Sequence, residues 1–486
     1  MKKYVSIFLF TFIVLLSFLL HHKYINHEIS GLHDWRQTQT GWNIRNFTRY
    51  DFNILNPRVA SFNGGKDNIY RYEFPVYQWV IGGIQKIIGE DVSVIRYSTF
   101  LLGLCSLLGF YYLLKNLGFK SYVSLFGVWA FNFSPVFYYY TINPLPDNLA
   151  LCAGIWFLSF FVKNLNRYSI KNTILGALFL SLSIASKLPF ILFGGVLFFY
   201  LIIQTFYKKP SNYKQVAQQL SIYITFLLPT LLWYIWVMPT WENGVTSGIF
   251  GNKITWKTAL IILDYHLYIM FPKILMNIAC LPFLFFGLWN ILKVETLKNI
   301  KFKALFFSFA LVLLYFLFEL NMIGIVHDYY MFPFLPFLFL LITFGFNELI
   351  KQNDSLISKI MIGVLIILMP GLTAYQNKNS WDPYSYKEIY ERQNEFKNAV
   401  PSNEQCIILN DVSGYIFPYL IDKRGHIFKD DYLPKEWVKD IISRYKVKYI
   451  YSNSRKVEKE ISEFIRDTVY SYGNINVFRL EVQPNQ

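Results

Sequence analysis

The chain has 486 residues and a formal net charge of +15. Only 16% of its residues are charged, while 54% are hydrophobic and 20% are aromatic, whereas a soluble globular domain carries about 25% charged residues. This composition excludes an ordinary soluble protein and a disordered chain, because neither accommodates so much Phe and Tyr. Nucleic-acid binding, the usual interpretation of a pI near 9.3, would need basic residues gathered on one soluble face. The composition instead predicts a chain that lies mostly in lipid.

Eleven apolar segments are predicted to span the membrane, since a span needs about 20 predominantly apolar residues. The first follows Lys2 and Lys3 and lacks the small-residue cleavage site of a secretory signal, so we expect an uncleaved helix. Ser186–Pro189 interrupts one long apolar stretch, and a turn at this depth must be buried in protein or line a wet cavity. The predicted spans are residues 4–20, 94–114, 121–141, 147–162, 172–186, 188–206, 217–238, 272–292, 304–323, 329–347 and 359–375.

The basic residues are distributed unequally between the loops that join these segments. Alternate loops, counted from the N-terminus, contain 16 Lys and Arg residues against three acidic ones. The remaining residues up to Gln376 contain 13 basic and 12 acidic side chains. Because Lys and Arg are retained on the cytoplasmic side, we expect a multi-pass protein of the plasma (inner) membrane with a cytoplasmic N-terminus. With eleven spans the C-terminus is then extracytoplasmic, and the net charge reflects orientation.

Two hydrophilic regions are predicted to lie on the extracytoplasmic side: the first loop, residues 24–93, and a C-terminal domain, residues 377–486. Predicted helices and strands alternate in the C-terminal region, which indicates a small α/β domain beside a transmembrane domain of residues 1–376. It contains no Gly-rich phosphate loop, metal-ligand spacing or nucleophile elbow, so we expect a lid, a scaffold or an acceptor-docking domain. Its predicted helices are residues 387–399, 434–445 and 456–467, and its predicted strands are 405–410, 446–451 and 475–480.

The first loop opens with Gly31-Leu-His-Asp-Trp-Arg-Gln-Thr-Gln-Thr40, in which Asp34 falls just beyond the first span. A carboxylate at the lipid–water boundary is suited to take a proton from an acceptor hydroxyl. Its neighbours Arg36 and Gln37 are suited to hold an anionic or hydroxylated ligand. The alternative is structural, because Asp is a common helix cap and Trp a common interfacial anchor.

Two further acidic residues lie in predicted extracytoplasmic segments. Glu73 precedes Pro75, a sequence that suits the start of a helix along the membrane surface. It either forms an ion pair with Arg71 or serves as an oxygen ligand of a divalent metal. Asp147 lies in a short turn between two predicted spans, where it either caps a helix or contributes to a site.

Three basic side chains complete the set of candidates. Lys187 lies between the fifth and sixth predicted spans, and a lone cation near the membrane indicates a site whose partner is a phosphate or a carboxylate. His266 lies in the fourth outer region, and His327 opens the segment His327-Asp-Tyr-Tyr330, which also holds Tyr329. Each His is suited to ligate a metal or contact a phosphate, or else to anchor its segment by a hydrogen bond. Together these groups predict a site where a lipid-borne phosphate meets an external substrate.

Five of these segments follow one another in a recognisable order: His33-Asp34-Trp35-Arg36-Gln37, the Glu-Phe-Pro-Val-Tyr run at 73–77, Pro146-Asp147-Asn148, the Ser-Lys-Leu-Pro turn at 186–189, and His327-Asp-Tyr-Tyr330. Their order resembles that of the GT-C superfamily of glycosyltransferases, specifically its polytopic protein-mannosyltransferase and aminoarabinose-transferase-like branch. The resemblance spans most of residues 1–376 in motif order and topology, and the C-terminal domain matches in architecture.

The resemblance implies a GT-C-like helical bundle that transfers a sugar from a polyprenyl-phosphate donor to a lipid, glycan or protein acceptor outside the cytoplasm. It implies that Asp34 is the general base and that Asp147 is a further acid of the catalytic site. It makes Glu73 and His266 candidate ligands of a divalent metal ion. Lys187 and Arg71 are expected to bind the carrier phosphate. The remaining candidates are expected to bind substrate: Arg36, Gln37, His327, Tyr329 and Tyr330.

Two other functions are compatible with a basic and aromatic groove: a transporter or flippase of a lipid-linked sugar, and a non-catalytic membrane scaffold. The long first loop, the C-terminal domain and the lack of paired Gly/Pro-broken spans argue against the transporter. The concentration of ionisable groups at one face argues against the scaffold. We expect no nucleic-acid partner.

Overall fold

The computed structural model describes residues 3–62, 67–203, 213–241, 248, 254–291, 299–352 and 355–482. The chain forms two compact units. The helical unit comprises Met1–Asn26, Tyr72–Tyr77 and Val92–Asn379, and the mixed unit comprises His27–Arg71, Gln78–Asp91 and Ser380–Gln486. The mixed unit therefore joins most of the predicted first loop to the C-terminal segment. The division into domains 1–376 and 377–486 stays a prediction.

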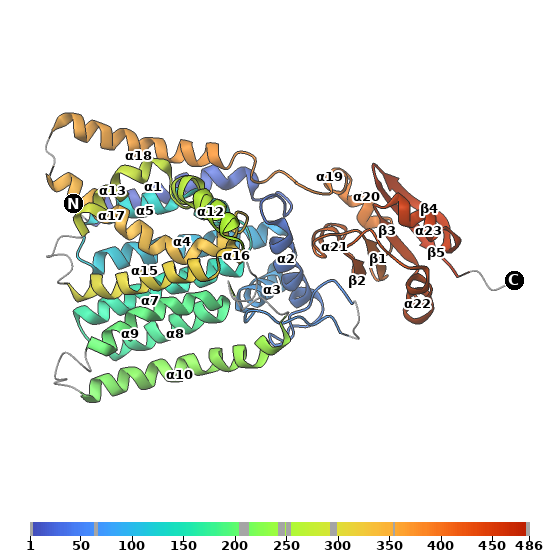
Figure 1. The fold of residues 1–486 in the computed structure, drawn as a ribbon, viewed down its shortest axis with the longest axis horizontal. Helices are drawn as coiled ribbons and strands as arrows, with labels where there is room; N and C mark the ends of the chain where they lie inside the picture. The colour runs from blue at the N-terminus through green and yellow to red at the C-terminus, as the bar shows by residue number, and fades with distance from the viewer. Residues whose placement is uncertain are drawn as a thin grey trace. The chain divides into compact units, whose positions relative to one another are not determined.

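The helical unit is a bundle whose long helices run side by side (Figure 1). Eight of its described helices are long and apolar enough to cross a membrane, and three further apolar helices are shorter, which confirms a mainly α, polytopic protein. Its α-helices are α1 (Lys3–His21), α4 (Val92–Asn116), α5 (Ser121–Asn132), α6 (Pro135–Tyr140), α7 (Pro146–Asn166), α8 (Ile170–Ser186), α9 (Gly195–Ile202), α10 (Tyr213–Val237), α12 (Trp256–Tyr265), α13 (Leu281–Ile291), α15 (Ile300–Phe318), α16 (Leu320–Ile323), α17 (Leu335–Gln352) and α18 (Leu356–Gln376). Its 3-10 and π segments are η1 (His22–Tyr24), η2 (Leu188–Gly194), η4 (Met238–Thr240), η5 (His266–Leu275), η6 (Ile278–Cys280) and η7 (Asp328–Phe334).

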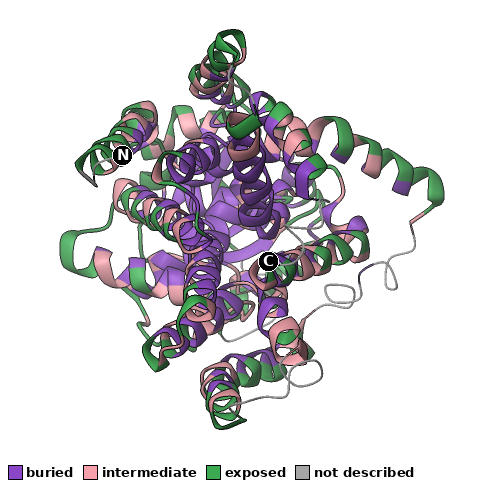
Figure 2. Cartoon of the chain, turned by 90° about the vertical axis from the view of Figure 1, so that its left-hand side faces the viewer, coloured by how far each residue is buried: buried purple, intermediate pink, exposed green. Residues whose placement is uncertain are grey.

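Burial distinguishes the middle of the bundle from its outer helices (Figure 2). In the apolar stretch of Asp328–Gln352, which includes α17, 94% of the residues are buried, against 11% in α18. Helix α18 exposes large apolar side chains such as Leu356, Ile360 and Ile367. Exposed apolar surface of this extent is unfavourable in water and favourable against lipid tails. The outer faces of the bundle therefore agree with a membrane environment.

Three segments of the helical unit differ from the predicted spans. The predicted span 121–141 is broken into α5 and α6, because Ser134 accepts the Phe137 amide as an N-cap and Pro135 takes the first helical position. The predicted span 188–206 opens with the 3-10 segment η2, after the expected break at Lys187, whose backbone is extended. Trp256–Leu275 forms an apolar helical stretch long enough to cross a membrane, although residues 256–271 were predicted as outer loop and only 272–275 as part of a span. The count of eleven spans stays a prediction.

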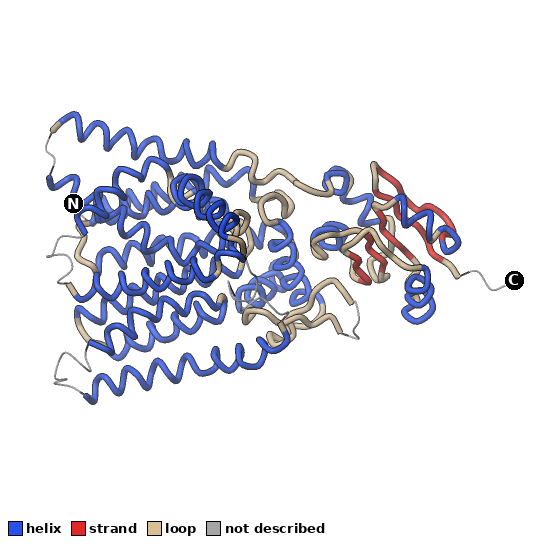
Figure 3. The backbone as a smooth tube through the Cα atoms, viewed as in Figure 1, coloured by secondary structure: helices blue, strands red, loops and turns tan. Residues whose placement is uncertain are grey.

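The mixed unit contains α2 (Asp34–Arg49), most of α3 (Val76–Ile88) and a five-stranded sheet, drawn in red in Figure 3. The strand order is β2-β1-β3-β5-β4; β1 pairs in parallel with β2 and β3, whereas β5 pairs antiparallel with β3 and β4. The small C-terminal α/β fold is thereby confirmed. The strands are β1 (Cys406–Leu409), β2 (Gly425–Phe428), β3 (Tyr449–Ser452), β4 (Ile465–Tyr472) and β5 (Ile475–Leu480). The helical segments around them are α19 (Lys387–Glu391), α20 (Gln393–Asn398), α21 (Ile416–Ile421), α22 (Lys435–Tyr445), α23 (Arg455–Glu460) and η8 (Ser462–Phe464).

The sheet has an apolar core, and its two edge strands were not predicted. Ile407 and Ile450 of the central strands pack with Val438 of α22 and Val457 of α23. The predicted helix 456–467 is wrong at its end, because residues 465–472 form the edge strand β4. An edge strand exposes one side and carries polar residues there, so its apolar alternation is weak. Pairing with β5 therefore decides its structure.

Candidate active site

Lys187 and Asp147 form an ion pair in the helical unit. Pro146 starts α7, so Asp147 lies in the first turn of this helix, and Lys187 directly follows the end of α8. Lys187 Nζ lies 3.4 Å from Asp147 Oδ1. Only 2% of the Asp147 side chain and 14% of the Lys187 side chain are exposed. A buried carboxylate is stable only with such a partner, so Lys187 is the counter-ion of Asp147.

Two tyrosine rings complete the surroundings of the Lys187 ammonium. Its Nζ lies 5.0 Å from the ring centroid of Tyr330 and 5.6 Å from that of Tyr329. The negative face of each ring attracts the cation. His327 flanks the same rings, with its centroid 5.4 Å from that of Tyr330, and its Nδ1 lies 2.8 Å from a backbone carbonyl oxygen. Residues predicted from three separate motifs thus form one cluster.

The segment that carries Glu73 contacts the end of α8. The backbone N–H of its neighbour Phe74 donates to the Ala185 carbonyl oxygen at 2.9 Å, and Ala185 precedes Lys187 by two residues. Glu73 is itself half-buried. The segment that carries Glu73 is therefore held against the end of α8, which directly precedes Lys187.

The sequence analysis missed a buried hydrogen bond behind the cluster. The hydroxyl of Tyr140, in α6, donates to Asp328 Oδ1 at 2.9 Å, and both side chains are buried. Asp328 precedes Tyr329 in the chain, so this bond fixes the segment whose rings face the ammonium. The pairing joins residues 188 positions apart, and no local pattern in the sequence predicts it.

Arg96 is a second residue that the sequence analysis missed. It is fully buried in α4, and its Nη1 donates to Asn143 Oδ1 at 2.5 Å and to the Ile142 carbonyl oxygen at 3.4 Å. Asn148 in turn donates its Nδ2 to the Asn143 carbonyl oxygen at 2.9 Å. Arg96 thus holds the turn that leads into α7 and to Asp147. A single Arg in the apolar run 94–114 is the signal that would have identified it, because such residues are rarely accidental.

Glu73 and His266 are the predicted metal ligands. His266 is buried; its Nδ1 lies 2.8 Å from the Ile262 carbonyl oxygen and its ring packs 4.8 Å from that of Phe316. No three His, Cys, Asp or Glu side chains in the described part of the chain are arranged to hold an ion. The assignment of Glu73 and His266 as metal ligands therefore stays a prediction.

In the mixed unit, Asp34 is the first residue of α2. The preceding residue, His33, adopts a left-handed backbone with φ +53°, and Asp34 Oδ1 accepts the Trp35 amide at 2.8 Å. Asp34 is 7% exposed. Burial raises its pKa to about 6; the Trp35 amide and the charge of His33 oppose this rise, and the charge of Asp411 adds to it. A carboxyl that titrates near neutrality at the start of a helix is a suitable general base.

Asp411 is a residue of this region that the sequence analysis did not identify. It is fully buried, and its carboxylate accepts the Ser413 hydroxyl at 2.7 Å and the Tyr386 hydroxyl at 3.3 Å. Burial raises the pKa of Asp411. Burial raises the pKa of Tyr384, and the charges of Asp382 and Asp34 add to this rise. The C-terminal segment therefore contributes an acid and two tyrosines to the surroundings of Asp34, and nothing in their spacing marked them.

The other predicted ligands of the first loop form bonds within it. Gln37 is fully buried and donates its Nε2 to the Leu32 carbonyl oxygen at 2.6 Å, and the buried Arg36 bonds to Gln39 in the same helix. Both lie in α2, two and three residues after Asp34, and their role as substrate contacts stays a prediction. Arg71 instead donates to the backbone carbonyl of Leu55 at 2.8 Å, so its guanidinium holds the turn at 53–56.

The sequence model of the family described as Dolichyl-phosphate-mannose-protein mannosyltransferase matches residues 73–236, the part that contains Glu73, Asp147 and Lys187. No curated protein matches the chain. The apo structure of ArnT from Cupriavidus metallidurans is similar over 99% of both chains, with a TM-score of 0.66 and 11% identity. The chain has the fold of the GT-C glycosyltransferases.

Other structures with the GT-C fold show the same likeness. ArnT bound to undecaprenyl phosphate covers 98% of both chains, at 11% identity and a TM-score of 0.62. The archaeal oligosaccharyltransferase AglB from Archaeoglobus fulgidus, in complex with an inhibitory peptide and a dolichol-phosphate, covers 94% of this chain, which spans 70% of AglB, at 11% identity and a TM-score of 0.61. At these identities the likeness concerns the fold. The resemblance inferred from the motif order is confirmed.

Proposed function

We propose that this chain is a membrane glycosyltransferase that moves a sugar from a polyprenyl-phosphate donor to an acceptor on the extracytoplasmic side. The match to the mannosyltransferase family and the GT-C fold support the class of enzyme. The ArnT structure bound to undecaprenyl phosphate supports the class of donor. The sugar and the acceptor, which is a lipid, a glycan or a protein, are left open.

The observation that carries the proposal is the shielded cation of Lys187. An ammonium beside two tyrosine faces, with one buried carboxylate, has donors left for a second anion. The phosphate of a carrier lipid is an anion that would accept these donors. In surroundings with little water, the attraction between the ammonium and a phosphate is far stronger than at a wet surface. His327 flanks the rings and adds a further candidate contact.

The chemistry needs few groups. The acceptor oxygen forms a bond to the anomeric carbon while the bond from that carbon to the phosphate oxygen breaks, in line and with inversion. The electron pair of the broken bond stays on the polyprenyl phosphate, whose growing charge the Lys187 ammonium stabilises. If the acceptor is a hydroxyl, its proton goes to Asp34. The transition state has oxocarbenium character, as in other glycosyl transfers.

Asp147 is assigned to this reaction as a positioning residue. Its carboxylate lies 3.4 Å from Lys187, so it holds the lysine ammonium in place. Arg96 acts one step further away, because it holds the turn before α7. Arg36 and Gln37 remain proposed substrate contacts beside Asp34, and Arg71 remains a proposed phosphate contact.

The proposed orientation has the Lys-rich loops on the cytoplasmic side of the plasma (inner) membrane. Bonds between these loops support a common end of the bundle. Asn166 donates to the Asn116 carbonyl oxygen at 2.8 Å, and Tyr168 donates to Gln218 at 2.8 Å. The connection between α4 and α5, the one between α7 and α8, and the start of α10 thus meet, and each carries Lys or Arg.

A transfer assay with reconstituted protein tests the proposal. Proteoliposomes receive polyprenyl-phosphate hexoses and pentoses labelled in the sugar, together with lipid, glycan or peptide acceptors. We expect covalent transfer of one sugar class to one acceptor class by the wild type. Movement of the intact donor across the bilayer without transfer would indicate a flippase, and neither event would indicate a scaffold; either result would refute the enzyme.

A matched pair of lysine variants tests the phosphate contact in the same assay. Lys187→Ala should raise the apparent KM for the donor at least tenfold, because it removes the shielded cation. Lys171→Ala serves as the control, because Lys171 lies in the first turn of the same helix, α8, and is exposed. Equal donor KM values in the two variants would exclude Lys187 from the phosphate site.

A further inference from the structure

The C-terminal segment binds the residues that lead into α2. The Leu32 amide donates to the Ser380 carbonyl oxygen at 2.9 Å. The Ser30 hydroxyl donates to the Trp381 carbonyl oxygen at 2.7 Å, and the hydroxyl of Tyr390 donates to the carbonyl oxygen of residue 29 at 2.8 Å. Three hydrogen bonds therefore join residues 29–32 to residues 380–390, immediately before Asp34.

Gly31 makes this approach possible. Its φ is +92°, a backbone conformation that residues with a side chain rarely adopt. A Cβ at this position would also overlap the Ser380 carbonyl oxygen. The two backbones are thus in direct contact, and any larger residue must push them apart.

The remainder of α2 is held by the same segment. The Arg45 guanidinium donates to the Tyr419 carbonyl oxygen at 3.0 Å and stacks 4.3 Å from the centroid of the Tyr419 ring. The Trp42 ring meets that ring edge-on at 6.5 Å. Helix α2 is consequently fixed along its length, from the residues before Asp34 to its last turns.

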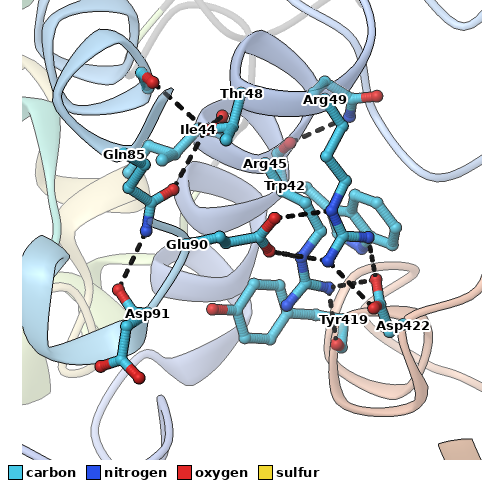
Figure 4. Close-up of polar contacts among 12 residues, drawn as sticks. Trp42, Ile44, Arg45, Thr48, Arg49, Gln85, Glu90, Asp91, Tyr419 and Asp422 are labelled. Carbon is cyan, nitrogen blue, oxygen red and sulfur yellow. Dashed lines mark hydrogen bonds and ion pairs between the residues drawn. The ribbon is translucent and has the colours of Figure 1, made fainter. Parts of the chain in front are cut away.

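Ion pairs of Arg45 and Arg49 hold the C-terminal end of α2, as Figure 4 shows. We call these two residues and their acidic partners, Glu90 and Asp422, the arginine clamp. Arg45 and Arg49 both pair with Glu90, at 3.2 and 2.6 Å, and with Asp422, at 3.1 and 2.7 Å. Although burial acts in the opposite direction, Arg45 and Arg49 hold the pKa of Asp422 well below its usual range. Asp422 follows α21, so the clamp joins α2 to the residues after α3 and to the C-terminal segment.

We propose that residues 380–390 of the C-terminal segment position Asp34, so that this segment is a working part of the base site and not a lid or docking domain alone. The inference rests on the proposed function, in which Asp34 is the base. A helix that starts at Asp34 and is held at both ends has little freedom to move its first side chain. Transfer is sensitive to such placement, because a shift of about 1 Å in a reacting group can cost about 100-fold in rate.

Gly31→Ala tests the contact directly, and Gly118→Ala is its control. Gly118 has φ +98°, so alanine there meets the same backbone strain, but its Cβ would have no atom within 4 Å. The two variants therefore differ in the overlap with Ser380. Both are made in the full chain, reconstituted in nanodiscs, and assayed with the labelled polyprenyl-phosphate sugar that the wild type uses.

We expect Gly31→Ala to lower kcat at least tenfold while the donor KM changes less than about twofold. Hydrogen exchange of the amides at 29–34 should accelerate in Gly31→Ala and stay unchanged in Gly118→Ala. In an Asp34→Asn background, Gly31→Ala should cost nothing further, because a misplaced base and an absent base are equivalent. A merely structural role predicts independent, additive losses instead.

A kcat for Gly31→Ala equal to that of Gly118→Ala would overturn the inference, and so would an undiminished loss in the Asp34→Asn background. Unaltered hydrogen exchange of the amides at 29–34 would also overturn it, since the contact with Ser380 would then not hold these residues. A wild type that transfers no sugar would refute the proposed function instead. The exchange measurement needs no turnover and would still decide whether Ser380 holds the residues before Asp34.

Discussion

The two candidate carboxylates of this chain, Asp147 and Asp34, are both buried but have opposite surroundings. Asp147 has the Lys187 ammonium at 3.4 Å. Asp34 lies near another carboxyl, that of Asp411, and burial raises its pKa to about 6. A carboxylate beside a cation acts as its counter-ion, whereas an acid whose pKa is raised toward neutral pH exchanges protons easily. The comparison supports our proposal that Asp147 positions Lys187 and that Asp34 is the base.

The largest effect is expected from Asp34→Asn. The amide cannot accept the proton of a hydroxyl acceptor, so transfer should fall about 100- to 10,000-fold with the donor KM little changed. Asp67→Asn, at an exposed acid of the same loop, is the control and should transfer normally. Initial rates with the labelled donor give both values. Transfer by Asp34→Asn at the wild-type rate would remove the distinction between the two carboxylates.

The ion pair between Lys187 and Asp147 should contribute to the stability of the folded protein. Lys187→Ala leaves Asp147 buried without its cation, which typically costs about 3–5 kcal/mol. The double variant Lys187→Ala with Asp147→Asn should recover most of this loss, while donor binding stays weak. Thermal unfolding of the two variants and of Asp147→Asn alone measures the coupling. A double variant as unstable as Lys187→Ala would contradict the counter-ion role.

The pKa of Asp34 predicts opposite trends in activity and stability. The folded pKa, about 6, lies above the ordinary value of 3.8, so this group contributes stability below about pH 4 that is lost as the pH rises through 6. At pH 8, Asp34→Asn should therefore be more stable than the wild type by up to about 3 kcal/mol, the equivalent of the shift. Wild-type kcat/KM should fall as the pH drops below about 6. A pH-independent stability difference would contradict the raised pKa.

The clamp at the far end of α2 should show the smallest effect. Asp422→Asn removes the partner of Arg45, Arg49 and Lys397, and Asn tolerates the left-handed backbone at this position. Since the arginines are partly exposed, we expect a loss of about 1–2 kcal/mol that shrinks at high salt. Glu463→Gln breaks an exposed pair with Lys435 and should cost less than about 0.5 kcal/mol. Urea unfolding followed at Trp437 measures the free energy of unfolding of both variants. Equal losses would contradict a stabilising role of the clamp.

Local patterns predicted much of the fold. Apolar runs of about 20 residues identified most of the long helices, and the Ser-Lys-Leu-Pro sequence identified the break between α8 and η2. Three of the five strands followed from apolar alternation. The edge strand β4 escaped, because its exposed side is polar and its order depends on a partner strand.

The candidate site divides in the same way. Asp34, Asp147 and Lys187 stand out in the sequence because a charge at the edge of an apolar run is costly and therefore informative. Arg96 is also a charged residue in an apolar segment, 94–114, but the sequence analysis did not identify it as a candidate. Asp411 carried none, since an Asp in a soluble domain is ordinary.

The sequence by itself determined that this chain lies in a membrane, which segments are apolar, and which charges stand at their ends. These properties follow from composition and from periodicity within about 20 residues. Only the tertiary structure decided that Lys187 pairs with Asp147, and that residues 380–390 hold the approach to Asp34. Such contacts join positions 40 to 361 residues apart, and packing of whole elements selects them. Most of the net charge of +15 comes from the predicted loops, whereas the proposed chemistry depends on a few charges that packing has brought together.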